Sequence, residues 1–203
     1  MNKRILIWLV SNGQRRDDET YLQFETNFFG PLRLIRAALP SMRARRSGTI
    51  VNITSIAGQD GLPSCGLYAG SKFALEGLSE SLARELAPFD ISLLVVEPGA
   101  FKTNFLAAAA KNETGLSEPY IGGPVDVALG KFDTMQGTQR GDPLKGVARV
   151  FEVVTGEGQA GSLKGKILRL PLGSDCVERI EAKLKSLSHD VEASREVAFS
   201  TDY

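Results

Sequence analysis

The chain has 203 residues, and its 24 basic and 24 acidic side chains leave a formal net charge of zero. This balance gives no argument for binding nucleic acid or an acidic partner. Apolar residues make up 42% and charged residues 24%, which is ordinary for a single globular domain over 1–203. No apolar run reaches about eighteen residues, so no membrane span is expected.

The residue types that hold metals or disulfides are scarce. Cys65 and Cys176 form no motif and indicate reduced thiols, hence a cytoplasmic location. His189 is the only histidine, which leaves too few ligands for a zinc site, so no metal is expected.

The N-terminal part predicts a strand and then a long helix. A short apolar run at 4–10 indicates the strand. Apolar residues recur at steps of three and four over about 18–45, which predicts a helix. Pro31 removes a backbone donor inside this helix and can kink it.

A strand, a helix and a second strand follow, at about 49–54, 67–87 and 91–96. The nearly continuous apolar character of 49–54 indicates a strand buried on both faces. A helix between parallel strands forms a right-handed crossover, and ligands in such sheets bind beyond the carboxyl ends of the strands. We therefore expect an α/β fold with a cleft at that edge.

The C-terminal part predicts shorter elements. A short helix at 104–111 lies in a segment of about 104–123 that is either a mobile lid over the substrate or an ordinary connector. Ser174 can cap a closing helix, and 190–203 is expected to form a loose tail. The other expected elements are a helix at 125–136, a helix from Asp142-Pro143 to about Gly156, a strand at 166–170 and the closing helix at about 175–189.

The most informative motif is Tyr68-Ala69-Gly70-Ser71-Lys72. Residues four apart on a helix share a face, so the phenol of Tyr68 and the ammonium of Lys72 can point into one cleft. A nearby cation lowers a phenol's pKa from about 10 toward neutrality, which suits a general acid/base in a carbonyl–alcohol interconversion. Ser55 could hydrogen-bond the carbonyl oxygen. Alone, Tyr-x-x-x-Lys is a weak signal, and the alternative is an exposed tyrosine beside a solvated lysine.

Neighbouring motifs strengthen this signal through their order. Asn27 stands in Thr-Asn-Phe-Phe-Gly, Ser55 ends the first buried run, and Pro98-Gly99 ends the second. The combination resembles the short-chain dehydrogenase/reductase family, whose tetrad is Asn, Ser, Tyr and Lys in that order. The resemblance covers about 21–104 strongly and the remainder loosely. It implies a three-layer Rossmann-like domain, a parallel sheet with flanking helices.

The resemblance also implies a role for each residue of the tetrad. Tyr68 would be the acid/base, and Lys72 would lower its pKa and hold the ribose of the nicotinamide nucleotide. Ser55 would polarise the substrate carbonyl. Asn27 would help to position a water beside Lys72. The reaction would interconvert a carbonyl and a secondary alcohol.

The implied cofactor is NAD(P)(H), with NADP favoured. Besides Tyr68 and Lys72, the cofactor-binding residues would be Pro98, Gly99, Phe101 and Thr103. If 104–123 is a lid, the side chains of Phe101, Phe105 and Leu106 favour an apolar or aromatic substrate.

One part of the family pattern is absent from the sequence. The family's first strand leads into a turn of the type Thr-Gly-x-x-x-Gly-x-Gly, which binds pyrophosphate at a helix N-terminus. Here the first apolar run leads into Ser11-Asn12-Gly13. This segment is at best similar to the Asn-Asn-Ala-Gly sequence that ends a central strand in the family. The resemblance therefore implies a fold truncated at its N-terminal strands.

That departure keeps other functions open. The alternative is an impaired remnant that acts only as a binding or dimerisation module, since the helices at about 18–45 and 67–87 are those the family uses to form dimers. A serine hydrolase acting through Ser55 is disfavoured, because no Gly-x-Ser-x-Gly elbow exists and His189 is poorly placed.

Overall fold

The fold is described from a computed structural model that places residues 8–9, 17–111 and 115–203. Its main sheet has three parallel strands in the order β2-β3-β5. These strands are β2 (Gly48–Ile53), β3 (Ile91–Pro98) and β5 (Arg169–Leu172). The expected α/β class with a parallel sheet is confirmed.

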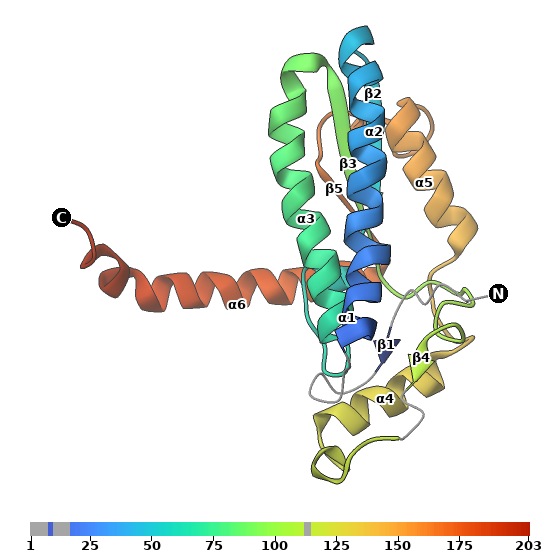
Figure 1. Cartoon of the computed structure of the whole chain (residues 1–203), viewed down its shortest axis with the longest axis vertical. Helices are drawn as coiled ribbons and strands as arrows, with labels where there is room; N and C mark the ends of the chain where they lie inside the picture. The colour runs from blue at the N-terminus through green and yellow to red at the C-terminus, as the bar shows by residue number, and fades with distance from the viewer. Residues whose placement is uncertain (1–7, 10–16, 112–114) are drawn as a thin grey trace.

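Helices cover both faces of the sheet and make three layers (Figure 1). On one face, α2 (Gly30–Arg45) and α3 (Gly66–Leu86) pack against the side of β3 that carries Leu93 and Val95. On the other face, α5 (Pro143–Thr155) packs against Leu94 and Val96. Alternate residues of β3 therefore fill two separate cores, as expected for a central strand.

The long N-terminal helix is divided into three segments. α1 (Asp17–Phe24) leads into the π-helical turn η2 (Glu25–Phe29), which continues as α2. Pro31 lies in the first turn of α2. Because proline has no N–H to donate to the preceding turn, the regular helical ladder is interrupted just before it.

The strand β2 differs from its sequence prediction. Burial on both faces was expected, but only Ile50 and Asn52 are buried, the residues between and beside them keep part of their surface accessible, and Ile53 is 51% exposed. The reason is that β2 forms an edge of the sheet in the described part of the chain. The helix α3 and the start of β3 lie where the sequence predicted them.

The prediction of a helix at 104–111 is wrong. Turns occupy the segment after Lys102, closed by bonds such as Ala108 N to Asn104 O, and β4 (Ala110–Lys111) ends it. β4 pairs with β1 (Trp8–Leu9) in a separate parallel ladder. A strand was predicted at 4–10, and its residues other than Trp8 and Leu9 lie outside the described part of the chain. The Ser11-Asn12-Gly13 segment that follows lies outside it too.

Two helices close the far side of the molecule. The helix α4 (Pro124–Met135) agrees with its prediction. So does α5, whose cap Asp142 accepts hydrogen bonds from the backbone N–H groups of Leu144 and Lys145.

The 3-10 turns are η3 (Ile56–Gly58), η4 (Ala87–Phe89), η5 (Glu118–Tyr120) and η6 (Gly161–Leu163).

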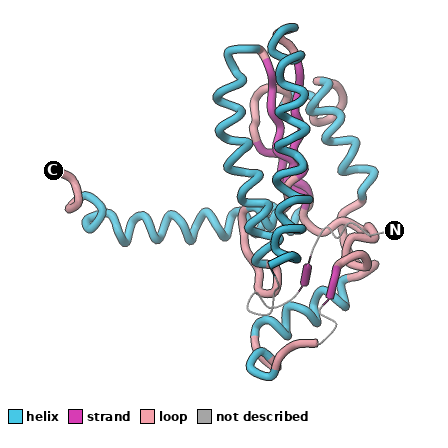
Figure 2. Tube along the Cα trace, in the orientation of Figure 1, coloured by secondary structure: helices cyan, strands magenta, loops and turns pink. Residues whose placement is uncertain are grey.

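The last helix needs two corrections. α6 runs from Ser174 to Phe199, ten residues beyond the predicted end at 189. Gly173, rather than Ser174, is its N-terminal cap. The segment 190–203, expected to be a loose tail, is helical as far as Phe199, and its residues are exposed. α6 projects away from the rest of the molecule (Figures 1 and 2). None of the helices in the described ranges is both long and apolar enough to cross a membrane.

Candidate active site

Ser55 lies directly after β2, at the carboxyl edge of the sheet. Thr54 prolongs the ladder, because its N–H donates to Val96 O at 2.8 Å. Ser55 itself is extended and caps η3, with its Oγ accepting from Ala57 N at 3.1 Å. The hydroxyl of Ser55 is thus held at the point where the chain leaves the sheet.

Tyr68 lies in the first turn of α3 and is buried, with 7% of its surface exposed. Its ring packs against the ring of Phe105, with centroids 5.9 Å apart. Cys65 belongs to the same small apolar cluster. The phenol therefore faces an apolar wall on one side and Ser55 on the other.

Lys72 lies one turn beyond Tyr68 on the same face of α3. Its Nζ donates to Ile53 O at 3.0 Å and lies 5.7 Å from the centroid of the Tyr68 ring. The backbone oxygen at the end of β2 thus holds the ammonium beside the tyrosine, as the helical spacing of the motif predicts.

Asn27 reaches the site from the π-helical turn. Its Nδ2 donates to Ser71 Oγ at 3.1 Å, and that hydroxyl donates to Tyr68 O at 2.7 Å. These two bonds tie the turn to the first turns of α3. A π-turn inside a helix often marks a functional site.

The electrostatics correct one expectation about Tyr68. Burial raises the pKa of Tyr68 to about 12, and the hydrogen bond with Ser55 only partly opposes this effect. Burial also lowers the pKa of Lys72 to about 8, against the negative charge of Glu76. The pKa of Tyr68 therefore stays well above neutrality here, because burial disfavours the phenolate.

The end of β5 and the start of α6 hold the loop after β3 through hydrogen bonds. Gly99 N donates to Leu172 O at 2.8 Å, and Ala100 N donates to Asp175 Oδ2 at 2.8 Å. A Cβ on Gly99 would collide with the carboxylate of Asp175, so a larger residue here would displace the side chain that holds this loop.

All eight residues named from the sequence line one cavity of about 620 Å³. They are Asn27, Ser55, Tyr68, Lys72, Pro98, Gly99, Phe101 and Thr103. Thr103 Oγ1 accepts from Phe105 N at 3.3 Å. A second cavity of about 490 Å³ runs along the edge of β2 and shares Asn27, Ile53 and Lys72 with the first.

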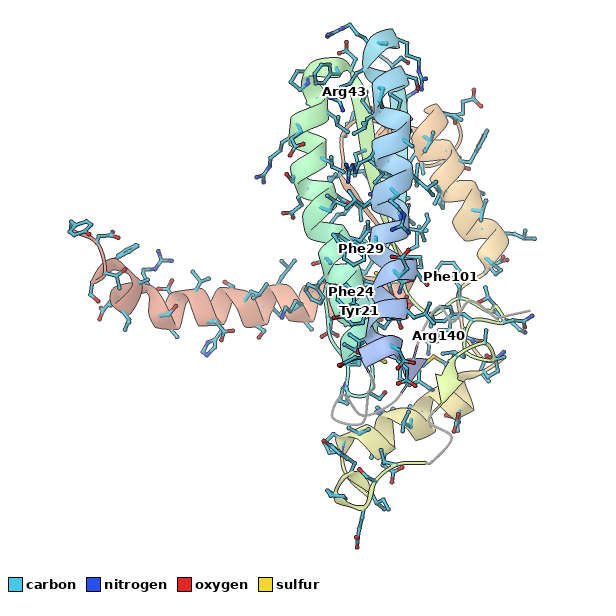
Figure 3. All side chains as sticks on the ribbon, in the orientation of Figure 1. Tyr21, Phe24, Phe29, Arg43, Phe101 and Arg140 are labelled. Atoms are coloured by element: carbon cyan, nitrogen blue, oxygen red, sulfur yellow. The ribbon has the colours of Figure 1, made fainter. Side chains whose placement is uncertain are left out.

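The wall opposite the tetrad is apolar. Phe101 lies near the N-terminal end of α5 (Figure 3) and fits against Gly146, where a Cβ would lie 2.8 Å from its ring. Phe105 and Phe132 close over Tyr68 from the loop and from α4. The remaining apolar side chains of this wall are Leu106, Met135, Val147 and Val150.

A layer of charged side chains lies beneath the tetrad. Glu76, one turn beyond Lys72, accepts from Thr54 Oγ1 at 2.6 Å and from Arg169 Nε at 3.0 Å. Arg169 also donates to Glu80 at 2.5 Å. Since Thr54 precedes Ser55, this layer joins β2, α3 and β5 directly below the site.

Glu97 completes this layer and is fully buried. Its Oε1 accepts from Gln59 Nε2 at 2.8 Å and lies 3.3 Å from Arg169 Nε. No described residue hydrogen-bonds its Oε2. Burial, reinforced by the charge of Glu76, raises the pKa of Glu97 to about 7. This carboxyl therefore readily holds a proton near neutral pH.

Sequence reasoning missed this layer and Asp175. For Glu97 a signal existed, because a charge inside the apolar run before Pro98-Gly99 is unusual in a buried strand. For Asp175 there was none, since its partners lie 75 residues away. The ion pair of Arg179 Nε with Asp60 Oδ2 at 2.8 Å, which joins α6 to the loop after η3, was equally hidden.

Comparisons with known proteins agree with this architecture. The chain is 47% identical over 124 residues to the oxidoreductase claN of Passalora fulva, covering 61% of this chain and 56% of the relative. It is 47% identical over 105 residues to a 3-ketodihydrosphingosine reductase of Bacteroides thetaiotaomicron, covering 51% of this chain and 39% of the relative. The chain thus spans about half the length of these relatives or less.

A solved structure covers nearly the whole fold. The crystal structure of a short-chain dehydrogenase from Streptomyces avermitilis superposes with a TM-score of 0.83 at 34% identity, covering 98% of this chain and 69% of that chain. The family model described as short chain dehydrogenase matches residues 9–114, just over half of the sequence. The chain therefore belongs to the short-chain dehydrogenase family.

Proposed function

We propose that the protein is an NAD(P)-dependent oxidoreductase that interconverts a carbonyl and a secondary alcohol, with Tyr68 as its general acid/base. The observation that carries this proposal is the convergence of Ser55, Tyr68 and Lys72 on one cavity at the carboxyl edge of the sheet. Parallel α/β sheets bind their ligands at this edge.

Tyr68 and Ser55 would act together on the carbonyl oxygen. With a pKa of about 12, raised by burial, Tyr68 keeps its proton at neutral pH and can donate it as an oxyanion develops. Ser55, held in place by its cap on η3, would hydrogen-bond the same oxygen. In the reverse direction, Tyr68 would accept the proton of the alcohol.

Lys72 and Asn27 would position the reacting groups. The ammonium of Lys72 is anchored on Ile53 O, close to the ring of Tyr68, where it favours the charged form of the phenol during proton transfer. Asn27 supports the same turn of α3 through Ser71. Its proposed water-positioning role comes from the family resemblance and is supported by its place, with Lys72, on the cavity wall.

The cavity fits the nicotinamide end of such a cofactor. Pro98 and Gly99 present backbone at the cavity, with Phe101 and Thr103 beyond them, and Lys72 offers a donor for ribose hydroxyls. When bound, the cofactor supplies or accepts the hydride. We favour NADP over NAD, as the sequence resemblance does.

The substrate side of the cavity favours an apolar molecule. Phe105, Leu106 and Phe132 offer little to a charged group, whereas the tetrad offers donors for one oxygen. One relative is named for the reduction of a 3-keto compound, which has the reacting group proposed here. We infer an apolar ketone or secondary alcohol as substrate, with 104–123 as the lid.

The decisive experiment is oxidation of NADPH by the purified chain with an apolar ketone. Tyr68→Phe should lower the rate about a thousandfold, because it removes the transferable proton and leaves the ring. Tyr21→Phe is the matched control, since Tyr21 is 73% exposed, and it should retain the full rate. Equal rates for the wild type and Tyr68→Phe would reject Tyr68 as the acid.

The alternative is a module that binds or dimerises without catalysis. The apolar side chains of Leu34 and Phe73, 74% and 42% exposed, offer α2 and α3 as dimer surfaces. Calorimetry with NADPH separates the two proposals: micromolar binding supports the enzyme, and absence of binding supports the module. A cytoplasmic location stays a prediction.

A further inference from the structure

The outer part of α6 exposes apolar side chains to solvent. Every residue from Leu184 to Tyr203 is exposed, and Leu184, Leu187 and Val191 keep 60%, 47% and 60% of their surface accessible. This part of the helix projects from the body (Figures 1 and 2). Helices in proteins gain most of their stability from packing of an apolar face, and this face has no such packing within the described chain.

The apolar residues of α6 follow the spacing of a coiled coil. Val177, Ile180, Leu184, Leu187 and Val191 are separated by steps of three, four, three and four. Two helices pack along such a seam by inserting each side chain between those of the other helix. The pattern continues in weaker form through Ser194 and Ala198. We call these seven residues the α6 seam.

The first turn of α6 is fixed to the body and orients the seam. Cys176 is fully buried and donates from Sγ to Glu97 O at 3.0 Å, while Arg179 binds Asp60. Within the described chain, the only residue after Ile180 on this helix that is not exposed is Lys183. The seam therefore leaves the body at a fixed place and points into solvent.

Charged residues beside the seam suit a second copy of the same helix. In an antiparallel pair, Leu184 lies opposite Leu187 of the partner subunit, and Ile180 opposite Val191 of the partner subunit. Lys183 then lies beside Asp190 of the partner subunit, and the two-fold symmetry forms this ion pair twice. The alignment overlaps nearly all 26 residues of α6.

In a parallel pair, Lys183 has no acidic partner on the other helix. Lys183 would then lie beside the neutral Ser188 of the partner subunit. Asp190 would have to bind Arg195 of the partner subunit, but in its own helix Arg195 already binds Glu192 at 2.8 Å. A parallel arrangement would also bring the two bodies to the same end of the helices. The unpaired charge of Lys183 and the crowding of the two bodies in a parallel pair favour the antiparallel arrangement.

We propose that α6 joins two copies of this protein through an antiparallel two-helix coiled coil along the α6 seam. The occupant is a second copy because the seam and its flanking charges are self-complementary under a two-fold axis. This interface is separate from α2 and α3, and it does not depend on catalysis or on cofactor binding.

The test is sedimentation velocity of the full chain over a wide concentration range. The wild type should show a monomer–dimer equilibrium. Lys183→Glu and Asp190→Lys should each weaken the dimer about tenfold, because each places like charges together twice. The double variant Lys183→Glu/Asp190→Lys should restore wild-type affinity. A parallel pair would instead tolerate Lys183→Glu, and that result would overturn the proposal.

Further variants locate the interface. Leu187→Asp should abolish the dimer, whereas Ala193→Asp, away from the seam, should leave its affinity unchanged. Circular dichroism checks that each variant remains helical. The proposal is overturned if the chain is monomeric at every concentration. It is also overturned if the dimer survives Leu187→Asp but is lost in Leu34→Asp, which would place the contact on α2.

Discussion

The two walls of the cavity are built in different ways. The wall that carries Ser55, Tyr68 and Lys72 rests on buried hydrogen bonds and on the charged layer of Glu76, Glu97 and Arg169. The facing wall consists of apolar side chains from turns and short helices. These side chains are held by packing contacts, such as that of Phe105 with Tyr68.

This difference allows the site to separate chemistry from selectivity. Directional bonds fix the atoms that would exchange a proton, and catalytic groups need such fixed positions. Apolar contacts have no preferred direction, so the facing wall can adapt to the shape of a substrate. Substitutions in the charged layer should therefore cost stability, whereas those in the apolar wall should change substrate affinity.

The largest expected effect is on the charged layer. Glu76→Ala removes the buried carboxylate that Arg169 and Thr54 share, and we expect a loss of about 3 kcal/mol in the free energy of unfolding. Urea unfolding measures this change. The control is Glu80→Ala, which removes the more exposed carboxylate bound to the same Arg169 and should cost under about 1 kcal/mol. Equal losses would contradict the special role of the buried layer.

The second prediction concerns the buried carboxyl of Glu97. Burial raises its pKa from 4.5 to about 7. Between these values the folded state keeps a proton that the unfolded state has released, so this group makes stability fall as pH rises. We expect a loss of about 2 kcal/mol between pH ~5 and ~8.

Glu97→Gln tests that sign, because glutamine resembles the protonated carboxyl and does not titrate. Urea unfolding at the two pH values should show that this decline is absent in Glu97→Gln and present in Glu80→Gln. A decline of equal size in both variants would assign it to another group.

The same two walls show what the sequence alone could predict. Tyr68 and Lys72 are four apart on a helix, and Ser55 ends an apolar strand, so local spacing and the sheet-edge rule already bring them together. The cap at Asp142 and the end of α5 at Gly156 were predictable for the same reason. In each case, both partners lie close in the sequence or at a known edge of the sheet.

The features that were not predictable join distant parts of the chain. Glu76 and Arg169 are 93 positions apart, and no local pattern links them. The pairing of β1 with β4 and the edge position of β2 depend on which strands meet in space. The rise in the pKa of Tyr68 was missed because burial was not weighed against the charge of Lys72.

The third prediction concerns the pH dependence of the proposed reaction. With the pKa of Tyr68 at about 12 and that of Lys72 at about 8, both shifted by burial, carbonyl reduction should be level below pH ~8 and decline above it as Lys72 loses its charge. Alcohol oxidation should rise with pH, because it needs the phenolate.

Initial rates in both directions test these profiles. Lys72→Arg should remove the decline in reduction near pH ~8, since arginine stays protonated, although its bulk will lower the rate overall. A decline at the same pH in Lys72→Arg would show that another group titrates there.

The smallest expected effect is on the apolar wall. Phe105 is half-buried against the ring of Tyr68, and its side chain is a hydrocarbon that contributes packing alone. Phe105→Ala should therefore raise KM for an apolar ketone about fivefold and change kcat by less than about twofold, as expected when uniform binding is lost. The loss in unfolding free energy should stay near about 1 kcal/mol. Phe151→Ala, at an exposed position on α5, is the control for removal of a phenyl ring. A fall in kcat as large as that of a tetrad variant would mean that Phe105 holds Tyr68 in place, and the two walls would then act as one unit.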